Sequence, residues 1–402
     1  MQTALPPDLR DSEDGRDAER ILRTCVHCGF CNATCPTYQL LGDERDGPRG
    51  RIYQIKEMLE HGRATEETRL HLDRCLTCRA CETTCPSGVE YHRLLEIGRN
   101  FVERQRQRPL GERLQRDLLL ATVPYPERLR PLLTIGNLAR PLLPPSLKAA
   151  LPVAAPTGDQ WPQNDHARTV LLLEGCVQSV THPRINAATA RVLDRLGIRA
   201  MPAAGCCGAL SHHLPNEQRL RETLRRNIDH WWPQIEAGAE AVLLTASGCA
   251  PTVRDYGRLL RDEAGYAERA ARLSALAMDI SEFLERQDLA ALKPAVPTDR
   301  PIAFHAPCSL QHGLKRGGRV EALLTGFGFR LTPVADAHLC CGSAGSYAVL
   351  QKDLSERLLA NKIRNLEAGD PALIATANIG CLMHLEKATG RPVRHWIELV
   401  AG

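Results

Sequence analysis

Cysteine is the residue type through which this 402-residue chain could do chemistry. Eight of its 16 cysteines lie between Cys25 and Cys85, and the other eight are spread from Cys176 to Cys381. A chain of this length can bury a core without disulfide bridges, and thiols that stay reduced act as metal ligands or redox groups. We therefore interpret these cysteines as metal ligands.

The N-terminal eight form two copies of one motif, C-x2-C-x2-C-x3-C-P, which run over residues 25–36 and 75–86. In ferredoxins with this spacing, three close thiolates hold one [4Fe-4S] cube and the fourth thiolate reaches the other cube. The spacing therefore predicts two [4Fe-4S] clusters. We expect cluster 1 to be held by Cys25, Cys28, Cys31 and Cys85, and cluster 2 by Cys75, Cys78, Cys81 and Cys35.

Zinc is the alternative metal, because four-cysteine zinc sites also use C-x2-C pairs. A zinc site needs two such pairs, whereas each motif here offers three tightly spaced cysteines and a fourth, repeated after a gap of 39 residues. This pattern favours iron–sulfur clusters. His27 lies between two of the cysteines, but we expect it to be a bystander because four thiolates already complete each cube.

Two helices are expected to position these motifs. Residues 49–60 place apolar side chains at helical spacing, and residues 89–102 form a second helical stretch after the second motif. We therefore expect an all-α dicluster ferredoxin-like domain over residues 15–103.

The C-terminal eight cysteines occur in two matching sets. The intervening segments have 29 and 41 residues in the first set and 31 and 39 in the second, and each set contains a Cys-Cys-Gly triplet. The match predicts two homologous cysteine-rich (CCG) subdomains over residues 169–290 and 300–402. Their candidate metal ligands are Cys176, Cys206, Cys207 and Cys249 in the first, and Cys308, Cys340, Cys341 and Cys381 in the second.

Short apolar strands alternate with helical stretches in both subdomains, which predicts parallel α/β sheets. Ligands of such sheets bind beyond the carboxyl ends of strands, where several of these cysteines fall. The glycine after each Cys-Cys pair permits a positive φ or a close backbone approach. We favour a metal or redox role over the alternative of small buried hydrophobic residues. The expected fold class is α+β overall, an all-α domain followed by two repeated α/β subdomains.

Residues 104–168 are expected to form a connector. Ten of the 27 prolines lie between Pro109 and Pro162, and we expect them to prevent long helices. The segment is also basic and leucine-rich, a mixture that could contact an anionic membrane surface or a partner subunit. The alternative, which we favour here, is a linker packed over the two domains.

The remaining composition argues against other partners. The net charge is only +4 and aromatic residues make up 4%, too few for a nucleic-acid-binding surface. The sequence has no apolar run of about 20 residues and no apolar signal core. We therefore expect a cytoplasmic protein with no nucleic-acid partner, which leaves peripheral contact with the inner face of the cell membrane open.

Residues 25–53 closely resemble the iron–sulfur subunits of bacterial glycolate oxidase, and residues 304–312 and the CCG repeats extend the resemblance over nearly the whole chain. The chain is more distantly similar to the third subunit of anaerobic glycerol-3-phosphate dehydrogenase and to the CCG subunit of heterodisulfide reductase. The resemblance implies that separate flavoprotein subunits oxidise glycolate to glyoxylate. This chain would carry the electrons toward a quinone or another acceptor, and no catalytic residue is expected in it.

Two alternative functions remain. The chain could serve a lactate or glycerol-3-phosphate dehydrogenase, or it could be a catalytic subunit like that of heterodisulfide reductase. Each repeat of that reductase ends in C-x2-C, whereas here Thr252 and His384 replace the final cysteines. Each repeat could therefore hold an ordinary cubane or no metal, and the second could also hold a cluster with His384 as an extra ligand.

Overall fold

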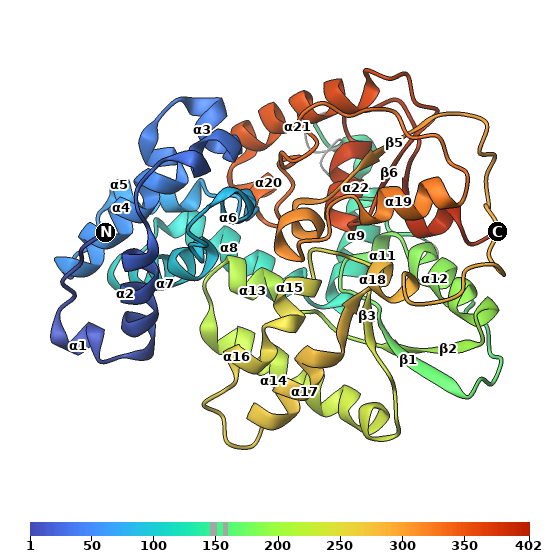
Figure 1. Ribbon diagram of the computed structural model, residues 1–402, viewed down its shortest axis with the longest axis horizontal. Coiled ribbons are helices and arrows are strands. Elements are labelled where there is room, and N and C mark those ends of the chain that lie inside the picture. The colour runs from blue at the N-terminus through green and yellow to red at the C-terminus, as the bar shows by residue number, and fades with distance from the viewer. Residues whose placement is uncertain (145–150, 156–159) are drawn as a thin grey trace.

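The N-terminal quarter of the chain is helical and lies beside two α/β parts that contain the strands (Figure 1). The structure is a computed structural model that describes residues 1–144, 151–155 and 160–402. Within these residues, the strands pair in parallel to form one four-stranded and one three-stranded sheet. The expected fold class, an all-α domain followed by two repeated α/β subdomains, is confirmed.

The N-terminal domain is built around two packed helices, α4 (Pro48–Glu60) and α7 (Tyr91–Gln105), which correspond to the two expected stretches. They pack closely, since a Cβ on Gly98 of α7 would lie 2.9 Å from Ile55 Cγ1 of α4. The other elements are α1 (Pro7–Arg10), α2 (Glu13–Thr24), η1 (Phe30–Thr34), α3 (Pro36–Leu41), η2 (Glu44–Asp46), α5 (Glu66–Asp73) and α6 (Ala80–Thr84).

The first cysteine-rich repeat is a sheet with strand order β2-β1-β3-β4. Its strands are β1 (Arg168–Leu173), β2 (Ile198–Ala203), β3 (Val242–Leu244) and β4 (Ala277–Asp279). The buried pattern of β1 and β3 agrees with strands covered on both faces. The helices of this repeat are α11 (Gln178–Thr181), α12 (Arg184–Arg195), α13 (Ala209–His213), α14 (Glu217–Glu236), α15 (Ala250–Arg254), α16 (Tyr256–Leu259), α17 (Ala267–Leu276) and α18 (Ile280–Leu284).

The second repeat has strand order β5-β6-β7. Its strands are β5 (Ile302–His305), β6 (Leu373–Thr376) and β7 (Val393–His395). Its helices are the π-helical turn η4 (Ser309–Gly313), α19 (Arg319–Gly326), α20 (Tyr347–Leu350), α21 (Lys352–Glu367), α22 (Ile379–Glu386) and the 3-10 turn η5 (Trp396–Leu399).

The two repeats share one hydrophobic core. Hydrogen bonds also join them, from Ser247 N to Ala377 O (3.1 Å) and from Gly248 N to Asn378 Oδ1 (3.2 Å). The N-terminal domain in turn contacts the second repeat, where Thr83 Oγ1 lies 2.8 Å from His312 Nδ1 and the hydroxyl of Tyr347 donates to Arg74 O (3.1 Å).

The connector differs from the expectation. Its described residues include two helices of 13 residues each, α8 (Leu110–Thr122) and α9 (Pro126–Leu138), followed by the 3-10 turn η3 (Arg140–Leu142). The expectation that prolines prevent long helices was wrong. Pro109 precedes α8 and Pro126 is the first residue of α9, where a missing N–H costs nothing, and α9 also accommodates Pro131 in its interior. Residues 145–150 and 156–159 of the expected connector lie outside the described residues.

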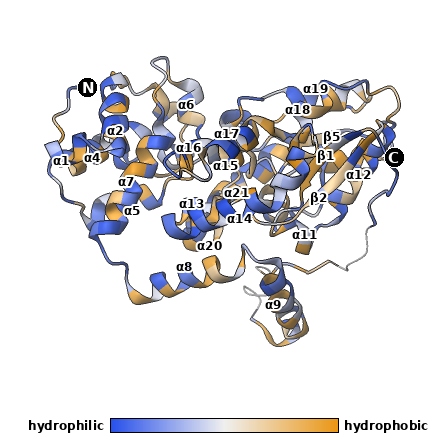
Figure 2. Cartoon of the chain, turned by 90° about the horizontal axis from the view of Figure 1, so that it is seen from below, coloured by the Kyte–Doolittle hydropathy of each residue, from blue (hydrophilic) through white to orange (hydrophobic). Residues whose placement is uncertain are grey.

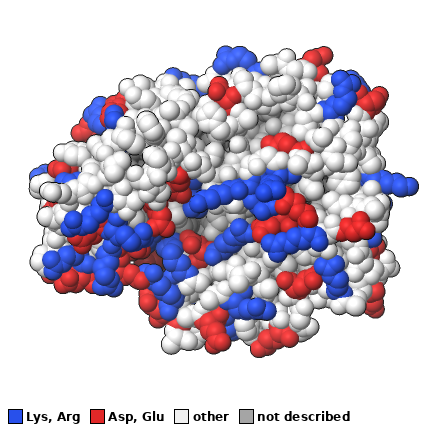
Figure 3. Space-filling view, in the orientation of Figure 1, with Lys and Arg blue, Asp and Glu red and all other residues white. Residues whose placement is uncertain are grey.

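Figure 2 shows α8 running along one side of the molecule, with α9 set off from the body. On α9, Leu129 and Leu133 pack against Val180 of the first repeat. Among the described helices, none combines the length and the apolar character that crossing a membrane requires. On the face shown in Figure 3, basic and acidic side chains are interspersed, in keeping with the small net charge.

The glycine of each Cys-Cys-Gly triplet has the positive φ that the sequence predicted, +90° at both Gly208 and Gly342. The space around it is also restricted, since a Cβ on Gly342 would lie 2.7 Å from the carbonyl oxygen of Ser355. These two glycines form equivalent turns, in which the glycine N–H donates to the sulfur of Cys206 (3.5 Å) and of Cys340 (3.4 Å).

We expect Gly342→Ala to destabilise the C-terminal half by about 1–3 kcal/mol, because alanine is strained at this φ and clashes with the backbone. The measurement is the thermal unfolding midpoint followed by circular dichroism. Gly390→Ala is the matched control, because a Cβ there meets nothing within 4 Å and its φ is not in the left-handed region. Equal midpoints for the two variants would contradict the expectation.

Candidate metal centres

Two cavities in the N-terminal domain are each lined by at least four of the motif cysteines. One is lined by Cys35, Cys75, Cys78 and Cys81. The other is lined by Cys25, Cys28, Cys31 and Cys85, and Cys81 lines it as well. The structure therefore brings together both expected sets, and each set combines three cysteines of one motif with the last cysteine of the other. Four thiols around one cavity fit a group that takes four thiolate ligands, as a [4Fe-4S] cluster does.

The same backbone turn shapes both motifs. Positive φ angles occur at His27 (59°) and Gly29 (86°) in the first motif and at Thr77 (53°) and Arg79 (62°) in the second. A left-handed conformation is uncommon for residues other than glycine, so the turn holds three side chains in a costly geometry. The spacing of the cysteines gave no sign of this strain.

The cavity around Cys25, Cys28 and Cys31 lies near the surface. Cys28 is exposed, and the neighbouring Phe30 side chain is exposed as well. Burial raises the pKa of Cys31 to about 11, and the nearby thiol of Cys25 adds to this rise. The thiol therefore keeps its proton until a metal displaces it.

The cavity around Cys75, Cys78 and Cys81 is more deeply enclosed. Burial raises the pKa of both Cys78 and Cys81 well above the usual range, and neighbouring thiols raise it further. Two donors point at the sulfur of Cys75, the hydroxyl of Tyr91 (3.6 Å) and the N–H of Thr77 (3.5 Å). Such hydrogen bonds stabilise a thiolate and tune the potential of a cluster bound to it.

A buried charge network lies beside the enclosed cavity, the one lined by Cys35, Cys75, Cys78 and Cys81, and it was not predicted from the sequence. The side chains of Arg51 and Asp46 are each only 1% exposed and form an ion pair at 3.3 Å. Arg51 also donates to His71 O (2.7 Å) and to Thr37 Oγ1 (3.1 Å). The second oxygen of Asp46 pairs with Arg74 at 2.9 Å.

Burial lowers the pKa of Arg51, but the nearby Cys75, Tyr91, Cys35 and Asp46 outweigh burial and leave the pKa raised. Arg51 therefore holds a fixed positive charge beside the thiols of the enclosed cavity. A sequence signal did exist: Arg51 lies four residues before the buried Ile55, on the apolar side of α4.

The cysteines of the first repeat form one connected group. Cys206 is hydrogen-bonded to Cys176 and Cys207, and Cys207 is hydrogen-bonded to Cys249. Hydrogen bonds from the Cys176 and Cys207 thiols hold the pKa of Cys206 well below its usual range. Cys176 and Cys249 follow the carboxyl ends of β1 and β3, as the predicted sheet required.

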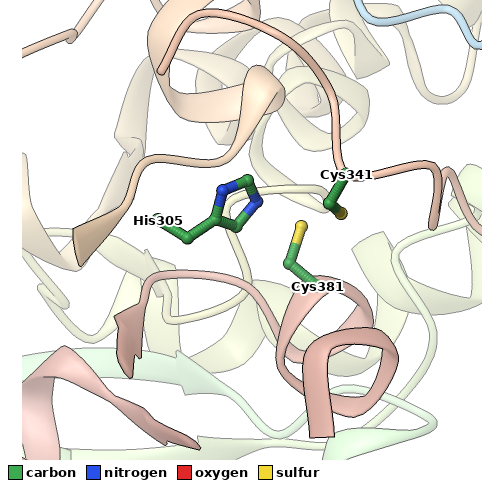
Figure 4. A group of neighbouring side chains, drawn as sticks. All are labelled: His305, Cys341 and Cys381. Atoms are coloured by element: carbon green, nitrogen blue, oxygen red, sulfur yellow. The ribbon is translucent and has the colours of Figure 1, made fainter. Parts of the chain in front are cut away.

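The second repeat also gathers its four cysteines. The sulfur atoms of Cys308 and Cys340 are 3.8 Å apart, and side-chain hydrogen bonds link Cys340 to Cys341 and Cys341 to Cys381. One imidazole that sequence reasoning missed joins them: ligand atoms of His305, Cys341 and Cys381 lie within 4.8 Å of one another (Figure 4).

His384, the candidate ligand from the sequence, lies one turn after Cys381 on α22. Its Nε2 atom is 3.2 Å from Ser355 Oγ. It is not a member of the three-residue group that contains Cys381.

The enclosed N-terminal cavity, which Cys78 lines, adjoins the second repeat. Cys78, Cys308 and Cys340 belong to one hydrophobic cluster with Leu76 and Leu358. The Cys308 thiol is close enough to raise the pKa of Cys78. The cysteines of two separate domains therefore lie next to each other.

Comparisons with known proteins agree with this architecture. Residues 21–89 match the model of a 4Fe-4S dicluster domain, and residues 170–254 and 302–386 each match that of a cysteine-rich domain. A lactate utilization protein A from Geobacillus thermodenitrificans is 26% identical over 235 residues, which cover 56% of this chain and 94% of that protein.

Two relatives match over a greater length. The probable glycolate oxidase iron-sulfur subunit of Bacillus subtilis is 30% identical over 91% of this chain and 88% of its own length. The glycolate oxidase iron-sulfur subunit of Escherichia coli is 54% identical over the full chain and 98% of its own length. With this identity, a dicluster domain and two cysteine-rich repeats, the chain belongs to the family of glycolate oxidase iron–sulfur subunits.

Proposed function

We propose that this chain is the electron-transfer subunit of a cytoplasmic glycolate oxidase complex. Flavoprotein subunits of the complex oxidise glycolate to glyoxylate, and this chain passes the electrons toward a quinone or another acceptor. The observation that carries the proposal is the pair of cavities, each lined by at least four thiols drawn from both motifs. The choice of glycolate is supported by the full-length similarity to the Escherichia coli protein.

We assign one [4Fe-4S] cluster to each N-terminal cavity. When bound, such a cluster accepts and releases one electron at a time, whereas a flavin can hold the two electrons that glycolate oxidation delivers. The residues of this chain supply thiolates, donate hydrogen bonds to the sulfur of Cys75 and hold the charge of Arg51 nearby. Substrate oxidation is assigned to the partner, and no catalytic residue is assigned to this chain.

The cysteine-rich repeats provide sites for a further iron–sulfur cluster. Its ligands would come from the connected thiols of the first repeat or of the second. The second repeat is the better placed to exchange electrons with the dicluster domain, because Cys78 packs against its cysteines.

Peripheral membrane contact would bring the chain close to a membrane quinone. Helix α8 exposes three leucines at helical spacing, Leu110, Leu114 and Leu118. Residues 104–148 also contain nine arginine and lysine residues against three acidic ones. An exposed apolar stripe in a basic segment suits the interface of an anionic membrane.

The role of the surface cavity can be tested with Cys28→Ser. We expect a loss of about four irons per chain, because a hydroxyl poorly replaces a thiolate in a cubane. Electron flow from glycolate to the acceptor should stop, while glycolate still reduces the partner's flavin. Iron analysis, EPR and flavin absorbance on the anaerobically purified complex measure these three effects.

His27→Asn is the control for Cys28→Ser. Asparagine tolerates the positive φ at this position, so the variant should retain its iron and its turnover. Full iron content and full turnover in Cys28→Ser would refute the ligand assignment. Iron loss in His27→Asn would instead make His27 more than a bystander.

The charge of Arg51 should raise the reduction potential of the cluster assigned to the enclosed cavity, because reduction adds negative charge that a nearby cation stabilises. We therefore expect Arg51→Met to make this potential more negative in an EPR-monitored redox titration. Arg45→Met is the control, because Arg45 lies at the surface and pairs with Asp43.

Arg51→Lys separates charge from folding, because it keeps the cation and loses the guanidinium hydrogen bonds. Its potential should stay closer to that of the wild type than the potential of Arg51→Met does. A folded Arg51→Met protein with an unchanged potential would show that this charge does not act on the cluster.

Membrane contact through α8 can be tested by co-sedimentation with vesicles that contain anionic phospholipid. We expect the double variant Leu114→Ser/Leu118→Ser to bind at least about tenfold more weakly, since each exposed leucine would bury apolar surface worth roughly 1.5–3 kcal/mol. Val349→Ser, on α20 and also exposed, is the control and should bind like the wild type. Absence of wild-type binding to these vesicles would exclude this contact.

A further inference from the structure

The imidazole of His305 is the least explained polar group in the second repeat. His305 is the last residue of β5 and only 1% exposed. Both ring nitrogens are buried and have no hydrogen-bond partner among the described residues. An unsatisfied buried polar group destabilises the folded state, so a ligand for this ring would remove that penalty.

The ring faces two sulfur atoms. Figure 4 shows the imidazole of His305 directed toward the side chains of Cys341 and Cys381. All three offer ligand atoms within 4.8 Å of one another. Through Cys341 the group continues to Cys340 and Cys308, so one imidazole and four thiols form a single set, in which Cys308 is half-buried and the other members are buried.

The surroundings suit a metal with thiolate ligands. A neutral imidazole carries a lone pair that can bind a metal, and no hydrogen-bond donor among the described residues occupies it in His305. Lys362 is 2% exposed, and its Nζ donates to Asp336 O at 2.8 Å. Burial lowers the pKa of Lys362, and the nearby Cys341 and Cys340 thiols act in the opposite direction.

The first repeat lacks this histidine. Leu173 ends β1 three residues before Cys176, as His305 ends β5 three residues before Cys308. The two repeats therefore place different side chains at the same register, and the imidazole belongs to the repeat whose cysteines pack against Cys78. This position next to the dicluster domain favours a redox-active metal over zinc.

We propose that the second cysteine-rich repeat holds an iron–sulfur centre of mixed ligation, in which His305 supplies a nitrogen ligand beside the thiolates of Cys341 and Cys381. The proposal rests on the proposed electron-transfer function, because the centre would exchange electrons with the cluster next to Cys78. A neutral imidazole in place of a thiolate raises the potential of an iron–sulfur centre. Electrons would therefore tend to move from the dicluster domain toward the second repeat.

The test is pulsed EPR on the full chain, purified without oxygen and measured both as isolated and after reduction. We expect one centre to show strong coupling to nitrogen, and the coupling should change to that of ¹⁵N when the protein is made with ¹⁵N-labelled histidine. His305→Leu, which copies Leu173 of the first repeat, should lose this coupling and keep the signals of the two N-terminal clusters. His384→Leu is the matched control and should retain the coupling.

Several outcomes would overturn the proposal. The first is that no coupling to histidine nitrogen is seen in either redox state. The second is that the coupling persists in His305→Leu or is lost only in His384→Leu. The third is that the metal bound at these cysteines is zinc. The labelled wild-type protein can still refute the proposal if His305→Leu does not fold, because it shows whether any histidine is coupled to the centre. Failure of the proposed function would look different, because the signals that depend on Cys28 would then be missing as well.

Discussion

The N-terminal domain depends on a positive charge that is buried beside thiols. Arg51 can remain buried because Asp46 pairs with it, and Asp46 in turn contacts Arg74 and His71. Removing one partner from such a buried network typically costs 3–5 kcal/mol, so its members must come together as a unit. The unit joins η2, α4 and α5, which all lie in the segment between the two cysteine motifs.

The segment that contains this network also brings the cysteines of the two motifs together around the same cavities. Each cavity is lined by three thiols of one motif and at least one of the other, so the second motif must fold back against the first. The 39 residues between them make that return as packed helices rather than as a loose loop. Neither cavity could form in a fragment that contained only one motif.

Features that depend on local spacing could be predicted from the sequence, and features that depend on distant contacts could not. The two sets of N-terminal cysteines, the parallel sheets and the positive φ of the Cys-Cys-Gly turns follow from patterns a few residues long. Arg51 was missed because a charged residue is normally assumed to be exposed. His305 was missed because it meets Cys381 only through the pairing of β5 with β6. The helices α8 and α9 were missed because the number of prolines in the connector does not show where each proline lies in a helix.

The shared core of the two repeats has a consequence for how the chain is made. Near the C-terminus, Trp396 is fully buried in that core and His395 Nε2 lies 2.9 Å from Thr245 O of the first repeat. The ribosome covers the most recently added residues, so the first repeat leaves it long before the segment that completes its packing. The first repeat therefore cannot complete its packing until residues 395 and 396 have left the ribosome, and a premature stop codon before His395 would harm a domain encoded 150 residues earlier.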